Sequence, residues 1–132
     1  MITISDVENR ISQKRLIELT QDDLNANAPD IAKIEDAIDK SISLVKAYLK
    51  GTDYENSNED FIKEITLDIC VYFLYKKRYS ELELQEGEKL AIYRNYENAI
   101  KLLEDIRNGK LDKKKIKAVG TKFSQSKNFI YE

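Results

Sequence analysis

Apolar residues recur at helical spacing in two long segments of the chain. In the first segment they lie three or four positions apart: Ile31, Ile34, Ile38, Ile42, Val45 and Leu49. A similar pattern is found near the other end of the chain: Ile92, Tyr93, Tyr96, Ile100, Leu103 and Ile106. Each set makes one apolar stripe on a helix. Gly51 and Gly109 follow these segments, where a left-handed residue commonly ends a helix.

A third segment, residues 59–79, contains an apolar and aromatic run from Ile69 to Tyr75 that no polar residue interrupts. The β-branched and aromatic content would also suit a strand, but the segment is longer than an ordinary strand. A helix that is apolar on all sides is typical of the middle of a bundle. The wider stretch 65–75 is too short for a membrane span, which needs about 20 apolar residues, and it contains the charged Asp68. We therefore expect no membrane association.

The chain before these segments predicts short helices. Ser5 and Glu8 have the spacing of a capping box, and a second short helix is expected through Leu16 and Leu19. Pro29 suits the first turn of the next helix. The sequence thus predicts an all-α fold, a small bundle of short N-terminal helices plus three longer ones. Its predicted core residues are Ile34, Ile38, Ile42, Val45, Ile69, Phe73, Tyr96, Ile100 and Leu103.

Charge divides the 132-residue chain unevenly. The net charge is −2, but residues 110–132 carry seven lysines against two acidic residues, a local charge of +5, and residues 1–109 carry −7. We therefore expect a helical domain at 1–110 and a basic, flexible C-terminal arm at 111–132. The one cysteine excludes an internal disulfide and favours a reducing compartment. The first ten residues lack the basic start and apolar run of a signal peptide.

The residue types that commonly carry catalysis are scarce in this chain. It has no histidine, the usual general base near neutral pH and the commonest zinc ligand. Cys70 lies within the apolar run, which indicates an inert thiol, and no glycine-rich phosphate loop occurs. We therefore expect neither an enzyme nor a bound cofactor or small-molecule substrate. Acidic residues from Asp53 to Glu64 partly fit a calcium loop, but Asn58 stands where that loop needs glycine, so no metal site is expected.

Two features remain as candidate sites. Asp68 is a carboxylate in an apolar helix, so it needs a partner. Arg10, Arg78, Arg94 and backbone groups are the alternatives, and we expect a structural role. The second feature is the tail, where four lysines would steer the arm to an acidic surface and three aromatic residues would anchor it. These candidate interface residues are Lys113, Lys114, Lys115, Lys117, Phe123, Phe129 and Tyr131.

Four stretches together resemble a known family. They are "TISDVENRISQKRLIELTQDD", "IEDAIDKSISLVKAYLKG", "FIKEITLDICVYFLYKKR" and "YRNYENAIKLLEDIRNGK". Their order and spacing are similar to those of the small head–tail connector, or head-completion, proteins of Mu-like phages and prophages. The matching positions are Asp6, Arg10, Ala37, Asp39, Tyr48, Leu49, Asp68, Ile69, Tyr72, Tyr96, Ala99, Leu103, Ile106, Gly109 and Lys110. The resemblance covers residues 3–111. The connector 52–60 departs from it by lacking prolines, and the tail beyond Leu111 lies outside it.

The resemblance implies a structural virion protein, assembled in the cytoplasm of the bacterial host, that forms a ring below the portal. Its partners would then be portal and tail-side virion proteins and neighbouring copies of itself. Since Arg10 and Asp68 both match the family pattern, Arg10 becomes the first choice as the partner of Asp68. The alternative is a cytoplasmic helical binding or regulatory module whose basic arm contacts a partner protein or nucleic acid. Nucleic acid is the less favoured partner, because the acidic body would repel a polyanion.

Overall fold

The computed structural model describes residues 1–23, 25–78 and 84–111. These residues form five helices and no strand, so the predicted all-α class is confirmed. The bounds are α1 Ile4–Arg10, α2 Gln13–Thr20, α3 Ile31–Leu49, α4 Asp60–Lys76 and α5 Glu86–Arg107. The middle helix is shorter than the expected 59–79.

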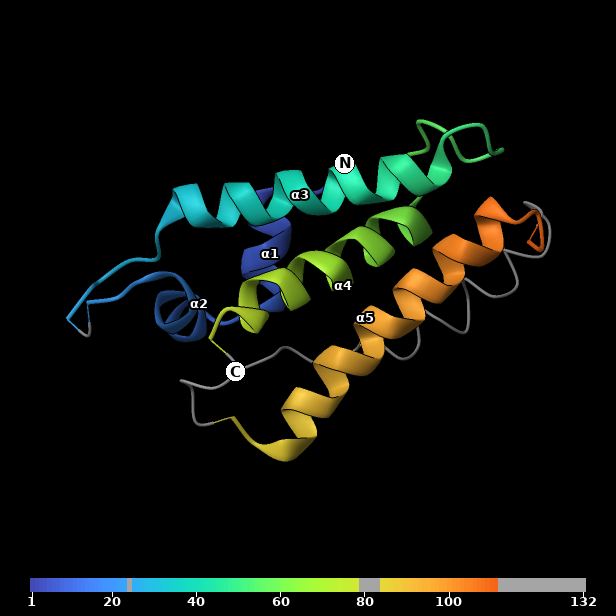
Figure 1. The fold of residues 1–132 in the computed structure, drawn as a ribbon. Helices are drawn as coiled ribbons and strands as arrows, with labels where there is room; N and C mark the ends of the chain where they lie inside the picture. Colours follow the sequence, from blue (N-terminus) through green and yellow to red (C-terminus); the bar gives the residue numbers. More distant parts are fainter. Residues whose placement is uncertain (24, 79–83, 112–132) are drawn as a thin grey trace.

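Helix α4 lies at the centre of the bundle, as its apolar sequence predicts. Helices α3 and α5 flank it, and α1 and α2 cover a further side (Figure 1). The two flanking helices come together at their C-terminal ends and diverge toward their N-terminal ends (Figure 1). This divergence decides how much of α4 is covered along its length.

Side chains at the helix ends explain where several helices begin and stop. Thr3 caps α1, and its backbone N–H donates to the Asp6 carboxylate at 2.8 Å. The expected Ser5–Glu8 capping box is therefore wrong, because the box lies two residues earlier. Asp30 caps α3 directly after Pro29. Gly51 and Gly109 have φ of 79° and 72°, which confirms their expected left-handed positions after α3 and α5.

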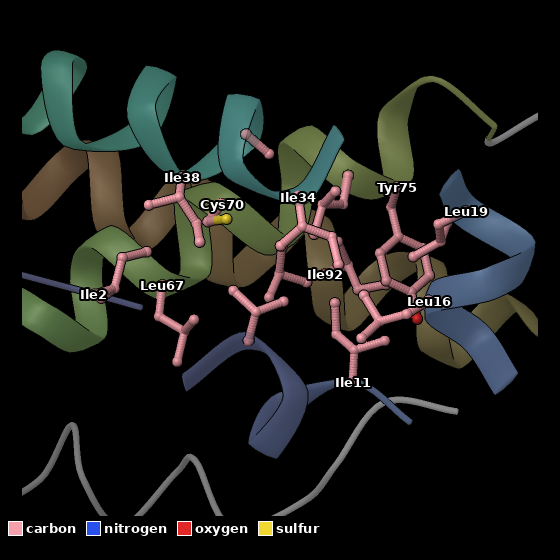
Figure 2. Close-up of a cluster of buried hydrophobic side chains, with 14 residues drawn as sticks. Ile2, Ile11, Leu16, Leu19, Ile34, Ile38, Leu67, Cys70, Tyr75 and Ile92 are labelled. Carbon is pink, nitrogen blue, oxygen red and sulfur yellow. The ribbon is translucent and has the colours of Figure 1, made fainter. Parts of the chain in front are cut away.

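One cluster of buried side chains joins all five helices (Figure 2). Tyr75 of α4 is fully buried and lies beside Leu16 and Leu19 of α2 (Figure 2). Cys70 of α4 lies beside Ile38 of α3 in the same cluster (Figure 2). Since α1 and α2 are short, this shared burial is what holds them on the bundle, because isolated helices of this length are marginal in water.

A second cluster occupies the end where α3 and α5 converge. Its members come from α3, the following connector, α4 and α5: Val45, Leu49, Tyr54, Ile62, Ile65, Ile69, Ala99, Leu103 and Ile106. Leu111, the first residue of the expected arm, is half-buried against it. Within the predicted core, Ile34, Ile38, Val45, Ile69 and Leu103 are buried, whereas Ile42, Phe73, Tyr96 and Ile100 are only half-buried.

Candidate functional site

Arg10, Asp68 and Glu64 form a network between α1 and α4. Arg10 Nη1 donates to Asp68 Oδ1 at 2.9 Å, and Nη2 donates to Glu64 Oε2 at 2.6 Å. Asp68 is 2% exposed and Arg10 is 7% exposed. Glu64 and Asp68 lie four residues apart on one face of α4, so a single guanidinium reaches both carboxylates.

This network has a structural character. Arg10 is the last residue of α1, and its positive charge suits the C-terminal end of that helix. The pair spans 58 residues of sequence and fixes the short α1 against the central helix. Arg78, another candidate partner of Asp68, instead bonds Asp22, and Arg94 is exposed on α5. A buried pair of this kind is costly to break, because one charge is then left without compensation.

The described residues show no arrangement suited to metal or thiol chemistry. Burial raises the pKa of the Cys70 thiol to about 12, and a hydrogen bond with Ser41 offsets this in part, so the nucleophilic thiolate is scarce near neutral pH. No group of three or more histidine, cysteine or acidic side chains in residues 1–23, 25–78 and 84–111 could hold a metal ion. None of the helices in these ranges is long and apolar enough to cross a bilayer.

A groove opens on the part of α4 that α3 and α5 leave uncovered. Its volume is about 430 Å³, and its residues come from the end of α2, from α3 and from the last turns of α4. The apolar side chains in its lining are Leu19, Ala37, Leu44, Phe73 and Leu74. A cavity of this size, apolar with polar groups at the edge, is typical of a binding site in proteins. We call it the α3–α4 groove.

Lysines surround the groove. Its rim carries Lys33 and Lys40 from α3, Lys76 from α4, Lys77 directly after α4, and one acidic residue, Asp36. All four lysines are exposed. Asp36 is already paired, because Lys40 Nζ lies 2.9 Å from Asp36 Oδ2. This hydrogen bond holds the pKa of Asp36 below its ordinary value. The rim is therefore basic, although the helical body as a whole is acidic.

Aromatic rings continue from the groove toward α5. Phe73 lines the groove, and the ring of Tyr96 lies 6.4 Å from it. Tyr96 in turn stacks on Tyr72, with ring centroids 4.0 Å apart and planes at 17°. Desolvation raises the pKa of Tyr96, since burial disfavours its charged form. These half-buried rings pack against one another beside the groove, between α4 and α5.

The groove was not expected from the sequence. The helical stripes place Phe73 and Tyr96 on inward faces, which led us to expect full burial. The only available signal was the run Lys76, Lys77 and Arg78 directly after the apolar segment, which indicates that the last turn of α4 meets water. That signal does not reveal a cavity, because the cavity depends on how far α3 and α5 diverge.

An acidic surface lies at the opposite end of α3, in the connector to α4. Asp53, Glu55, Glu59 and Asp60 are all exposed there, and residues 51–62 contain no basic residue. The candidate interface residues of the tail lie outside the described residues: Lys113, Lys114, Lys115, Lys117, Phe123, Phe129 and Tyr131. Their expected contact with an acidic surface therefore stays a prediction.

Comparison with known protein families gives a match over most of the chain. The family model described as "Bacteriophage Mu, Gp36" matches residues 2–128. The match extends well past Leu111, where the sequence resemblance ended, and so includes most of the basic tail. No curated protein and no solved structure matches the chain. Since the family model covers nearly the whole sequence, the chain belongs to the Bacteriophage Mu Gp36 family.

Proposed function

We propose that this protein is a non-enzymatic structural component of the phage particle, a head–tail connector that assembles as a ring below the portal. The observation that carries the proposal is the match to a phage family across residues 2–128. The polar groups buried in the described structure support it, because Arg10 and Asp68 bond each other and join two helices. The partners would be portal and tail-side proteins, and the protein would be located in the virion.

In a ring, one contact repeats around the symmetry axis, so each copy needs two different and complementary surfaces. We propose that the arm supplies one of them. Lys113, Lys114, Lys115 and Lys117 would meet an acidic surface of the next copy, and the exposed acids of the α3–α4 connector are suited to receive them. Phe123, Phe129 and Tyr131 would then anchor the arm.

A prophage that carries the gene allows a direct test. After the gene is deleted, induced cells are expected to accumulate DNA-filled heads without tails, visible by electron microscopy. Supplying the intact gene in trans should restore complete particles. Copurification with the portal protein of the same phage should be lost when the chain is shortened to end at Leu111. Normal particles from the deletion strain would refute the connector function.

The basic arm keeps one alternative open, a cytoplasmic regulatory module that binds nucleic acid. Its local charge of +5 would give retention on DNA that falls steeply with salt. This alternative predicts normal particle structure after deletion of the gene, together with altered phage gene expression. Particle morphology and DNA retention, measured on the same deletion and purified protein, therefore separate the two functions.

A further inference from the structure

A second surface stands out on the outer side of α5. Ile31, Leu90 and Tyr93 are the large apolar side chains that lie exposed in the described ranges, at 43%, 48% and 46%. Leu90 and Tyr93 are three residues apart, so they are neighbours on one helix face. Glu86 and Glu97 lie at either end of this pair and are exposed. We call these four residues the α5 stripe.

The α5 stripe and the α3–α4 groove are complementary, because the stripe has exposed apolar side chains and carboxylates and the groove has an apolar lining and lysines. The groove has an apolar lining that includes Leu44 and Phe73, and a rim of four lysines against one paired Asp36. The stripe presents two large apolar side chains between two carboxylates. Arg94 and Lys101 flank the stripe and are also exposed, so the carboxylates that can face the rim lysines are Glu86 and Glu97 alone among the four stripe residues.

The two surfaces do not overlap. The groove is lined by residues of α2, α3 and α4, and none of the described residues of α5 contributes to it. The stripe lies beside the core face of α5, which carries the buried residues Ile92, Ala99, Leu103 and Ile106. The ring of Tyr93 lies 6.1 Å from that of Tyr72 of α4 and is still 46% exposed. A copy therefore cannot fill its own groove with its own stripe without dismantling the bundle. Two different, complementary surfaces on one chain are what a repeating contact between identical copies requires.

We infer that the α5 stripe of one copy docks into the α3–α4 groove of the next copy. Leu90 and Tyr93 would enter the apolar groove beside Phe73, and Glu86 and Glu97 would face the rim lysines. Large aromatic and apolar side chains surrounded by charged groups are typical of the centre and rim of a protein interface. The inference rests on the proposed function, because it adds a contact between specific helices to the contact that the arm would make in the same ring.

Cross-linking between two differently tagged chains tests this contact. One chain carries Ser43→Cys at the groove and the other carries Arg94→Cys beside the stripe. Both positions are exposed, whereas the native Cys70 is buried. Mild oxidation should give a disulfide-linked pair of the two tags. Chains with Asn9→Cys on α1, in place of Arg94→Cys, are the matched control and should give none. A pair formed between two Arg94→Cys chains, or no pair at all, would overturn the inference.

Charge reversal gives a second readout. Adding Lys33→Glu and Lys77→Glu to the groove chain should abolish the cross-link, and adding Glu86→Lys and Glu97→Lys to the partner chain should restore it. The matched control reverses Lys14 and Lys50, two exposed lysines outside the groove, and should leave the yield unchanged. An undiminished yield with the groove variant, or no restoration by the swapped pair, would count against the assignment. Circular dichroism verifies that each variant folds.

The outcomes separate this inference from the connector function. Tailless particles in the deletion strain with no groove–stripe cross-link would leave the function standing and place the ring contact elsewhere. Normal particles with an efficient cross-link would refute the connector function and retain the self-association.

Discussion

Helix α4 is rich in apolar residues both up to Ile69 and beyond it, but the surroundings of these two halves differ. In the first half, Ile62, Ile65 and Ile69 are fully buried where α3 and α5 converge. In the second half, Phe73 is only half-buried and Lys76 is exposed, although apolar residues still dominate. The spacing of α3 and α5 makes this difference, since both flanking helices pack on α4 but diverge toward its C-terminal end (Figure 1).

The comparison shows that apolar content alone does not separate core from binding surface. The closed half uses its apolar residues for stability and holds Asp68 in a buried ion pair. The open half leaves an apolar groove with a lysine rim. Variants at the closed half should therefore reduce folding stability, and variants at the groove face of the open half should mainly alter contact with other chains.

The largest effect is expected for Asp68→Ala. It leaves the buried guanidinium of Arg10 with Glu64 alone, and breaking a buried ion pair of this kind costs about 3–5 kcal/mol. Urea denaturation followed by circular dichroism measures the loss. The double variant Arg10→Met with Asp68→Leu should recover much of it, because no buried charge then lacks its partner. A single variant that unfolds at the wild-type urea concentration would show that the network does not stabilise the fold.

Ile69→Ala tests the closed half directly. Ile69 is 0% exposed and belongs to the cluster between α3, α4 and α5. Removing its side chain should lower the free energy of unfolding by about 2–5 kcal/mol, from lost burial and the cavity left behind. Leu90→Ala is the control, since Leu90 is 48% exposed and should change stability by less than about 0.5 kcal/mol.

Phe73→Ala makes the same kind of change in the open half. Its ring is half-buried and contacts Tyr96 and the Lys76 ammonium, which lies 4.8 Å from the ring centre. We expect a smaller loss, about 1–2 kcal/mol, because much of the ring already meets water or the groove. The same urea titration measures it. A loss as large as that of Ile69→Ala would show that the two halves are equally part of the core.

The fold was largely predictable, because helical spacing is a local property of the sequence. The stripe from Ile31 to Leu49 and the stop at Gly51 predict α3 closely. The start of α1 was misjudged, because Thr3 and Ser5 both offer a hydroxyl and only the structure shows that Thr3 pairs with Asp6. The start of α4 has no such signal, because its cap is Glu59, which makes no side-chain hydrogen bond there.

The candidate site was predictable only in part. Asp68 in an apolar helix indicates that a partner exists, and the structure brings Arg10 to it from 58 residues away. The family resemblance, rather than residue spacing, favoured Arg10 over Arg78 and Arg94. The groove could not be predicted from the sequence, because the half-burial of Phe73 and Tyr96 depends on the angle between α3 and α5. Such angles arise from packing over whole helices.

Cys70 lies at the border between the closed and the open half of α4. The rate at which its thiol reacts reports whether the open half stays folded. With its pKa raised to about 12 by burial, the native thiol should react very slowly with a thiol reagent at pH 8. Unfolding in urea should make it react at the rate of a free cysteine. Because the folded pKa lies above the unfolded value of 9.0, the stability that this thiol contributes is constant below pH 9. It decreases as the pH rises toward 12. Fast labelling of the native protein would mean that the open half unfolds locally.

The smallest effect on stability is expected at the groove rim. Lys40 and Asp36 are both exposed and lie one turn apart on α3, with Nζ and Oδ2 separated by 2.9 Å. Exposed pairs of this kind contribute little to folding, since water screens them. Lys40→Ala should therefore leave the urea midpoint unchanged, whereas the pKa of Asp36, followed by NMR titration of its carboxyl carbon, should rise once the Lys40 hydrogen bond is gone. Lys46→Ala is the control, because Lys46 is an exposed lysine of α3 outside the groove and should shift neither quantity. A clear loss of stability in Lys40→Ala would show that the rim takes part in holding the bundle together, and that the open half is more than a surface for contact with other chains.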